Sequence, residues 1–190
     1  MINYNNIVAI GIFFALLVGG FFVVKDRIAS QDSDKNSAEE LFYSNAAYNI
    51  SFSYPLAYIL SEMDVEGGEM RERRAIILMR KEDMPLPEAG EGPPSITIDI
   101  YKNNSEAQTA EEWIRDSSES NFKLGEGVLA STTISGLPAL SYRWSGLYEG
   151  MTIVRAQPNF IYAFTVTYLE MGAPIVQDFA AIRDSVRISE

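Results

Sequence analysis

The sequence predicts an α+β domain built on an antiparallel sheet, preceded by one N-terminal transmembrane helix. Three observations support this prediction. An uncharged apolar run lies near the start of the chain, and hydrophobic residues then alternate with a period of two over most of the remaining length. Two segments, one beginning at Thr109 and one at Pro174, change to helical spacing. Short alternating strands joined by turns, with few helices between them, are typical of antiparallel α+β folds.

The apolar run covers residues 7–24 and contains 15 apolar residues, three glycines and no charge. As a helix it would be about 27 Å long at 1.5 Å per residue. This length nearly matches the hydrocarbon core of a bilayer, about 30 Å. A cleaved signal peptide is the alternative, but residues 1–6 contain no Lys or Arg and no convincing small-x-small cleavage site follows the run. We therefore expect residues 1–24 to form an uncleaved, single-pass membrane anchor.

Residues 25–45 carry three basic and five acidic side chains and are rich in Ser, Asp and Asn. This composition predicts a flexible acidic tether, because such a segment buries too little apolar surface to fold. The folded domain is then expected to cover residues 46–190.

Alternation predicts the strands of the domain, and prolines and glycines mark the turns between them. Residues 84–94 contain four prolines and two glycines, which predicts an exposed loop. Both sides of the strand at 160–169 are apolar, so this strand should be central and covered on both faces. The expected strands cover residues 48–54, 57–63, 75–81, 95–101, 128–134, 139–144, 148–156 and 160–169.

Two helices are expected. Thr109 and Glu112 have the spacing of a capping box, which predicts a helix that continues to about Phe122. Residues 174–188 begin with a proline, which the first turn of a helix tolerates. Four apolar residues in that segment fall at spacings of 4, 3 and 4, so they form one stripe that should lie on the sheet: Ile175, Phe179, Ile182 and Val186.

Composition excludes several functional classes. The chain has no cysteine and no histidine, so thiol nucleophiles, His-based general bases and the usual zinc and copper ligands are missing. Its net charge of −11, from 15 basic and 26 acidic residues, disfavours binding to nucleic acid. An acid-pair hydrolase using Asp99 and Glu149, or calcium at residues 32–34 or 66–69, is chemically allowed, but solvated acidic surface is the commoner role. We expect no enzymatic activity, no cofactor and no metal.

Three short sequences lie at corners of this pattern: ISFSYP at residues 50–55, ISGLPA at 134–139 and FAAIRDSV at 179–186. The order of elements, with these sequences, resembles the PsbP family over about 140 residues. The resemblance implies an α/β/α sandwich, with a central antiparallel sheet flanked by helices. The family's first motif usually continues to a Trp, and Tyr58 lies in that region here. Photosynthetic members stabilise the oxygen-evolving side of photosystem II. Many bacterial members have a membrane anchor or lipid attachment and no assigned role.

The membrane orientation rests on two opposing signals. Lys25 and Arg27 follow the apolar run, and the positive-inside tendency alone would keep the domain in the cytoplasm. The resemblance favours the opposite side, so we expect an extracytoplasmic domain on a membrane-bound protein.

Two clusters are candidates for a partner-binding surface. Arg71, Arg73 and Arg74 form the one basic concentration in the sequence and could dock an acidic partner, or could instead protect a sheet edge from aggregation. Trp144 and Tyr148 flank a turn, where aromatic residues often anchor interfaces, although a Trp on a strand is more commonly a core residue.

The leading hypothesis is a non-enzymatic, membrane-anchored interaction or assembly module with a protein partner of unknown identity. The alternative is a carrier or sensor that binds a small apolar ligand in a pocket between sheet and helix. An apolar cavity of about 300 Å³ or more would favour this alternative. A packed sandwich with an exposed patch would favour the interaction module.

Overall fold

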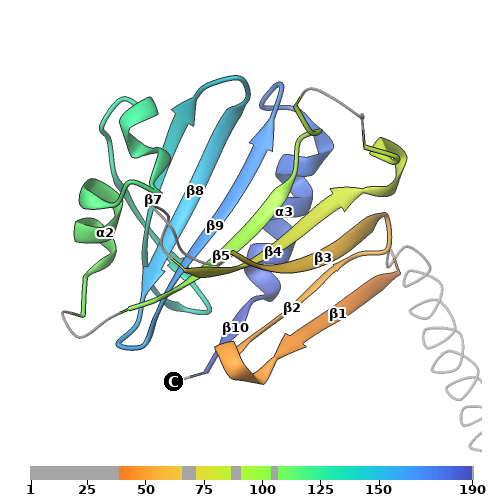
Figure 1. Cartoon of the computed structure of the whole chain (residues 1–190). Coiled ribbons are helices and arrows are strands. Elements are labelled where there is room, and N and C mark those ends of the chain that lie inside the picture. Colours follow the sequence, from red (N-terminus) through yellow and green to blue (C-terminus); the bar gives the residue numbers. More distant parts are fainter. Residues whose placement is uncertain (1–38, 66–71, 87–90, 104–106, 190) are drawn as a thin grey trace, which may run out of the picture. The chain divides into compact units, whose positions relative to one another are not determined.

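The computed structural model describes residues 39–65, 72–86, 91–103 and 107–189 (Figure 1). The expected membrane anchor, residues 1–24, and the tether up to residue 38 lie outside the described residues. So do Arg71 and the candidate calcium ligands at 32–34 and 66–69. Within the described part of the chain, no helix is long and apolar enough to cross a bilayer.

The larger sheet has seven antiparallel strands in the order β3-β4-β5-β9-β8-β7-β6 (Figure 1). β9 is the middle strand and is buried on both faces, which confirms the prediction of a central strand. The physical reason is that both alternating sets of its side chains are largely apolar and must be covered. The seven strands are β3 (Tyr58–Val65), β4 (Arg73–Arg80), β5 (Ile96–Lys102), β6 (Ala130–Ile134), β7 (Leu137–Ser145), β8 (Glu149–Ala156) and β9 (Phe160–Tyr168).

A second, three-stranded sheet was not expected from the sequence. It has the order β1-β2-β10, with β1 at Glu40–Asn45, β2 at Ile50–Pro55 and β10 at Arg187–Ile188. The prediction that the folded domain starts at residue 46 is therefore wrong, because β1 occupies the last six residues of the expected tether. Tyr43 of β1 is buried against Phe52 of β2, with ring centroids 5.0 Å apart. The pairing of β1 with β2 therefore buries Tyr43, which the polar composition of residues 25–45 does not indicate.

The two α-helices are α2 (Ala110–Asp116) and α3 (Pro174–Ser185). Thr109 and Glu112 form the expected capping box. α2 ends at Asp116 rather than near Phe122, since serine side chains there bond to nearby backbone amides and compete with helical bonding. Three short 3₁₀ helices complete the described chain: η1 (Ala46–Tyr48), η2 (Lys81–Asp83) and η3 (Asn121–Leu124).

The two helices pack against opposite faces of the large sheet (Figure 1). α3 and the small sheet cover the face that carries the three isoleucines of β5, and the expected stripe of α3 is buried there. α2 covers part of the other face, where Trp113 and Ile114 pack against Tyr101 and Tyr142. The α+β class is thus observed, with one apolar core on each side of the sheet.

Polar contacts secure α3 at both ends. Tyr58 of β3 donates its hydroxyl hydrogen to Asp178 at 2.7 Å. Near the end of the helix, the Ser185 hydroxyl oxygen accepts a hydrogen bond from the Ser53 amide at 2.9 Å, and it lies 2.7 Å from the Ile182 carbonyl and 3.1 Å from the Ser53 carbonyl. The Ser185 hydroxyl therefore satisfies the backbone amide of Ser53 where β10 no longer pairs with β2.

Candidate functional site

The two described arginines of the basic cluster point to opposite faces of the sheet, because they are consecutive residues of β4. Arg73 places its Nε 2.8 Å from an oxygen of Asp99 and its Nη1 3.6 Å from Glu119. Arg74 is ion-paired with Glu62 and, at 3.0 Å, with Asp64. Both guanidinium groups are therefore paired with carboxylates of the same domain.

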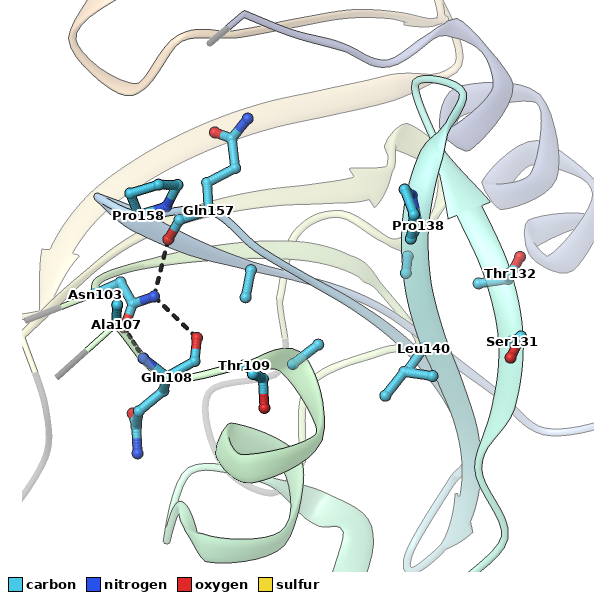
Figure 2. A pocket seen from close by; sticks show the side chains of 13 residues that line it. Asn103, Ala107, Gln108, Thr109, Ser131, Thr132, Pro138, Leu140, Gln157 and Pro158 are labelled. Carbon is cyan, nitrogen blue, oxygen red and sulfur yellow. Dashed lines mark hydrogen bonds between the residues drawn. The ribbon is translucent and has the colours of Figure 1, made fainter.

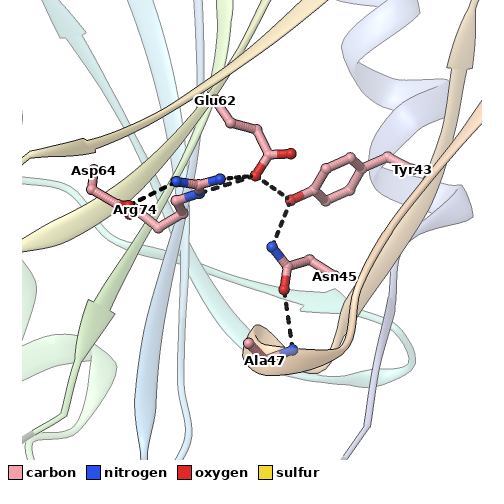
Figure 3. A network of polar contacts seen from close by, with 6 residues as sticks. All are labelled: Tyr43, Asn45, Ala47, Glu62, Asp64 and Arg74. Atoms are coloured by element: carbon pink, nitrogen blue, oxygen red, sulfur yellow. Dashed lines mark hydrogen bonds and ion pairs between the residues drawn. The ribbon is translucent and has the colours of Figure 1, made fainter.

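Arg74 belongs to a polar network that joins the two sheets (Figure 3). Glu62 of β3 accepts a hydrogen bond from Arg74 and a second, at 3.1 Å, from the hydroxyl of Tyr43 in β1. The Asn45 amide donates to the same hydroxyl at 3.2 Å and accepts from the backbone amide of Ala47. Burial raises the pKa of Tyr43. The contacts of Arg74 thus support a structural role, the attachment of β1 to the edge of the large sheet.

On the other face, Asp99 lies beside Arg73 and close to Tyr101. Burial is the largest influence on Asp99 and raises the pKa of its carboxyl, and the nearby Arg73 opposes this effect. Burial also raises the pKa of Tyr101. The Asp99–Arg73 pair is thus partly desolvated, and such pairs contribute less to stability than their geometry suggests.

This environment predicts an unusual sign for the pH dependence of stability. Because the pKa of Asp99 is raised above its ordinary 3.8, the folded chain binds the proton more tightly than the unfolded chain. Wild type should therefore lose stability relative to Asp99→Asn as pH rises from the ordinary pKa of 3.8 through the raised pKa of the folded state. Urea denaturation of both proteins from pH 3.5 to 7 measures the difference.

Glu112→Gln is the matched control, because the capping-box bonds lower the pKa of Glu112. For this pair the sign is reversed, and wild type should gain stability relative to the variant as pH rises. The same direction of change for both pairs would contradict the assignment of Asp99 as a desolvated carboxyl.

The second predicted cluster lies at the β7–β8 hairpin. The indole ring of Trp144 lies against Gly150, where a Cβ atom would be 2.2 Å from the ring. Its Nε1 donates to the hydroxyl oxygen of Thr152 at 3.1 Å, and that oxygen lies 3.0 Å from the hydroxyl of Thr165. Tyr148 donates its hydroxyl hydrogen to the carbonyl of Gly92 at 2.7 Å. Both aromatic side chains are half-buried and fixed in orientation.

The structure separates these two clusters. β4 is the second strand of the large sheet and β7 is the sixth, with β5, β9 and β8 between them. Arg73 lies opposite Tyr101 of β5, which in turn lies opposite Ile161 near the start of β9. Trp144 lies opposite Gly150 of β8, which in turn lies opposite Thr167 near the end of β9. The arginines and the aromatic residues therefore do not form one surface.

A groove of about 730 Å³ lies next to Trp144 and is called here the hairpin groove. The last residue of η3, Leu124, lines it together with Glu126 and Val128 of the following loop, and β7 contributes Arg143 and Trp144. Leu124 and Val128 are 54% and 65% exposed, and the neighbouring Leu147 at the hairpin is 64% exposed. The groove thus combines a fixed aromatic ring with accessible aliphatic side chains and a mixed charged rim.

A second groove, of about 500 Å³, lies between the start of α2 and strands β6 and β7 and is called here the α2 groove (Figure 2). None of the residues that line it is charged. Asn103 fixes one wall, since its amide nitrogen donates to the carbonyls of Gln108 and Gln157 at 3.0 and 2.8 Å, and its oxygen accepts from the Gln108 amide. Pro138 and Leu140 of β7 form the opposite wall.

The paired-acid chemistry considered from the sequence has no geometric support. Asp99 lies opposite Ala163, and Ala163 lies opposite Val154, so the side chains of Asp99 and Val154 project to the same face of the sheet. Glu149 lies five residues from Val154 along β8, so its side chain projects to the other face of the sheet. It accepts a hydrogen bond from Ser145 at 2.9 Å. Among the described residues, no group of three or more acidic side chains is arranged to hold a metal ion.

Comparison with known proteins identifies the fold. No family model matches the chain, and no curated protein sequence matches it. The solution structure of cyanobacterial PsbP (CyanoP) from Synechocystis sp. PCC 6803 superposes with a TM-score of 0.55 at 14% identity, covering 82% of this chain and 96% of that one. The domain has a PsbP-like fold. A crystal structure from Bacteroides thetaiotaomicron VPI-5482 has a TM-score of 0.49 at 10% identity, covering 78% of this chain and 48% of that one.

Sequence reasoning found one side of the hairpin groove of this PsbP-like domain and missed the other. Trp144 was identified from its position beside a turn. The segment that carries Leu124 and Val128 is not among the binding clusters predicted from the sequence. A usable signal was present, because two aliphatic residues flank two closely spaced glycines, and aliphatic residues in a turn-rich segment lack a strand or helix face on which to be buried.

Proposed function

We propose that the PsbP-like domain is a non-enzymatic protein-interaction module, and that its hairpin groove receives an apolar side chain of a protein partner. In this proposal residues 1–24 anchor the protein in a membrane and the domain lies on the extracytoplasmic side. The observation that carries the proposal is the fixed indole of Trp144 beside two exposed aliphatic side chains, Leu124 and Val128.

Three properties of the groove support a protein partner. Fixed aromatic side chains are favoured anchors, since little conformational entropy is lost when they are buried. Contiguous exposed apolar side chains rimmed by polar groups are typical of interaction surfaces on soluble domains. Arg143, Glu126 and Glu149 supply such a rim, and their charges can set the orientation of a partner without adding much affinity.

A second candidate function rests on the α2 groove. Its volume of about 500 Å³ exceeds the 300 Å³ expected of a ligand site, and its lining is uncharged. A small uncharged ligand held there, between helix and sheet, would make the domain a carrier or sensor. The two functions differ in the residues they require, since Trp144 does not line the α2 groove.

Site-specific photo-crosslinking of the full-length protein in its native membrane tests the leading proposal. A photoreactive residue at Val128 should form a discrete adduct with one protein, and Trp144→Ala should reduce its yield at least fivefold. Phe42 of β1 is the matched control, because it is 70% exposed and lies on a different sheet. Equal adducts from both positions, or no adduct from Val128, would contradict the proposal.

A further inference from the structure

The two edges of the large sheet differ in how well they are protected. β3 forms one edge and carries Glu62 and Asp64, which are held by Arg74. β6 forms the other edge and has the sequence ASTTI, with no charged residue and no proline. Natural edge strands are usually guarded by charges, prolines or bulges, because unpaired backbone groups accept a further strand. β6 lacks this protection.

The backbone groups that β6 presents outward follow from its register. Ser135 and Gly136 have φ of 54° and 73°, so they form a two-residue hairpin turn between Ile134 and Leu137. Pro138 has no amide hydrogen and lies opposite Thr133, so this is a pair without ladder hydrogen bonds.

The alternation of the ladder then assigns the remaining residues of β6. Thr132 bonds inward to β7, whereas the N–H and C=O groups of Ser131 and Thr133 point to the free edge. Both of these residues are exposed.

The two grooves meet along this strand pair. Ser131 and Leu140 are opposite one another and line the α2 groove, and the next pair, Ala130 and Ser141, lines the hairpin groove. Successive side chains of a strand project to opposite faces of a sheet. A segment paired with β6 would therefore direct every second side chain to the face that carries Leu140 of the α2 groove. Trp144 lies on this same face, four residues further along β7.

We propose that an extended segment of the partner protein adds to β6 as an eighth strand. This inference rests on the proposed function and specifies the kind of partner. Its side chains over the α2 groove are small and uncharged, matching the uncharged lining, and an apolar side chain occupies the hairpin groove. The segment is neutral or basic, because the chain carries a net charge of −11. The same charge disfavours a second copy of this chain as the added strand.

Selection from a displayed library of random 12-residue peptides, using the full-length protein in detergent, provides the probe. Ser131→Pro removes one amide hydrogen that points to the free edge and keeps the hydrogen bonds between β6 and β7. It should therefore lower the affinity for the selected peptide about tenfold. Ser131→Val keeps that hydrogen and should change affinity less than twofold. Hydrogen exchange of wild type gives a reading without mutation, since peptide binding should slow exchange of the Ser131 and Thr133 amides.

Three other results distinguish strand addition from the apolar anchor and from the peptide partner. Peptides whose affinity is lowered by Trp144→Ala but not by Ser131→Pro would support the proposed function and contradict strand addition. Affinity that is lowered by Ser131→Pro and unaffected by Trp144→Ala would support strand addition and contradict the role of Trp144 as the apolar anchor. Failure to select any peptide, or a dimer of the full chain that Ser131→Pro dissociates, would overturn the peptide partner.

Discussion

Replacing Phe179 with alanine should destabilise the domain by about 3–5 kcal/mol, the usual cost of truncating a buried Phe. Phe179 is 1% exposed and lies in the middle of α3, within the larger apolar core. Single domains are stable by only about 5–15 kcal/mol, so this one change should remove a large part of the total. Urea denaturation followed by circular dichroism measures the loss.

Gln177→Ala on the same helix is the matched control, because its side chain is exposed and the change should stay within about 0.5 kcal/mol. If Phe179→Ala cost less than about 1 kcal/mol, α3 would not hold the sheet as described. The large core would then not depend on the helix.

Replacing Gly125 with alanine should displace the loop that forms one side of the hairpin groove. A Cβ at this position would lie 2.2 Å from the backbone carbonyl oxygen of Arg143, so a backbone segment must shift, which costs more than moving the end of a flexible side chain. We expect a loss of about 1–3 kcal/mol, as for other overpacked sites. The loop should also separate from β7, which would widen the groove next to Leu124.

Gly146→Ala tests whether the effect is specific to this close approach. Its Cβ would meet only ordinary contacts, at 3.8 Å or more, and Gly146 also lies at the hairpin. The control variant should therefore keep wild-type stability and the wild-type fluorescence of Trp144. If both glycine variants behaved alike, the close contact between Gly125 and β7 would not be the reason for the result.

Elements with a strong local pattern were predictable. The stripe of α3 from Ile175 to Val186 and the strand at Phe160–Tyr168 each repeat one period over many residues, so no long-range information is needed to recognise them. The capping box at Thr109 is a local hydrogen-bonding unit and is found where the spacing predicts it. The end of α2 was not predictable in the same way, since several serines there form competing local bonds.

Features that depend on pairing between distant segments were not predictable. β1 ends a segment, residues 25–45, that has the polar composition of a tether. It becomes a strand only because β2, and through Tyr43 the edge strand β3, provide partners. Spacing along the sequence predicts one basic cluster at Arg71, Arg73 and Arg74. Alternation along β4 instead sends Arg73 and Arg74 to opposite faces, and each pairs with carboxylates supplied by other segments.

For this protein the sequence by itself determined the α+β class, the central strand, the position of α3 and one wall of the hairpin groove. These follow from periodicity and from turn and capping residues, which act over a few positions. Only the tertiary structure decided the second sheet, the separation of the two predicted clusters, and the two grooves that meet along β6 and β7. Such features arise from which strands lie side by side and in what register, and one-dimensional spacing does not contain this information.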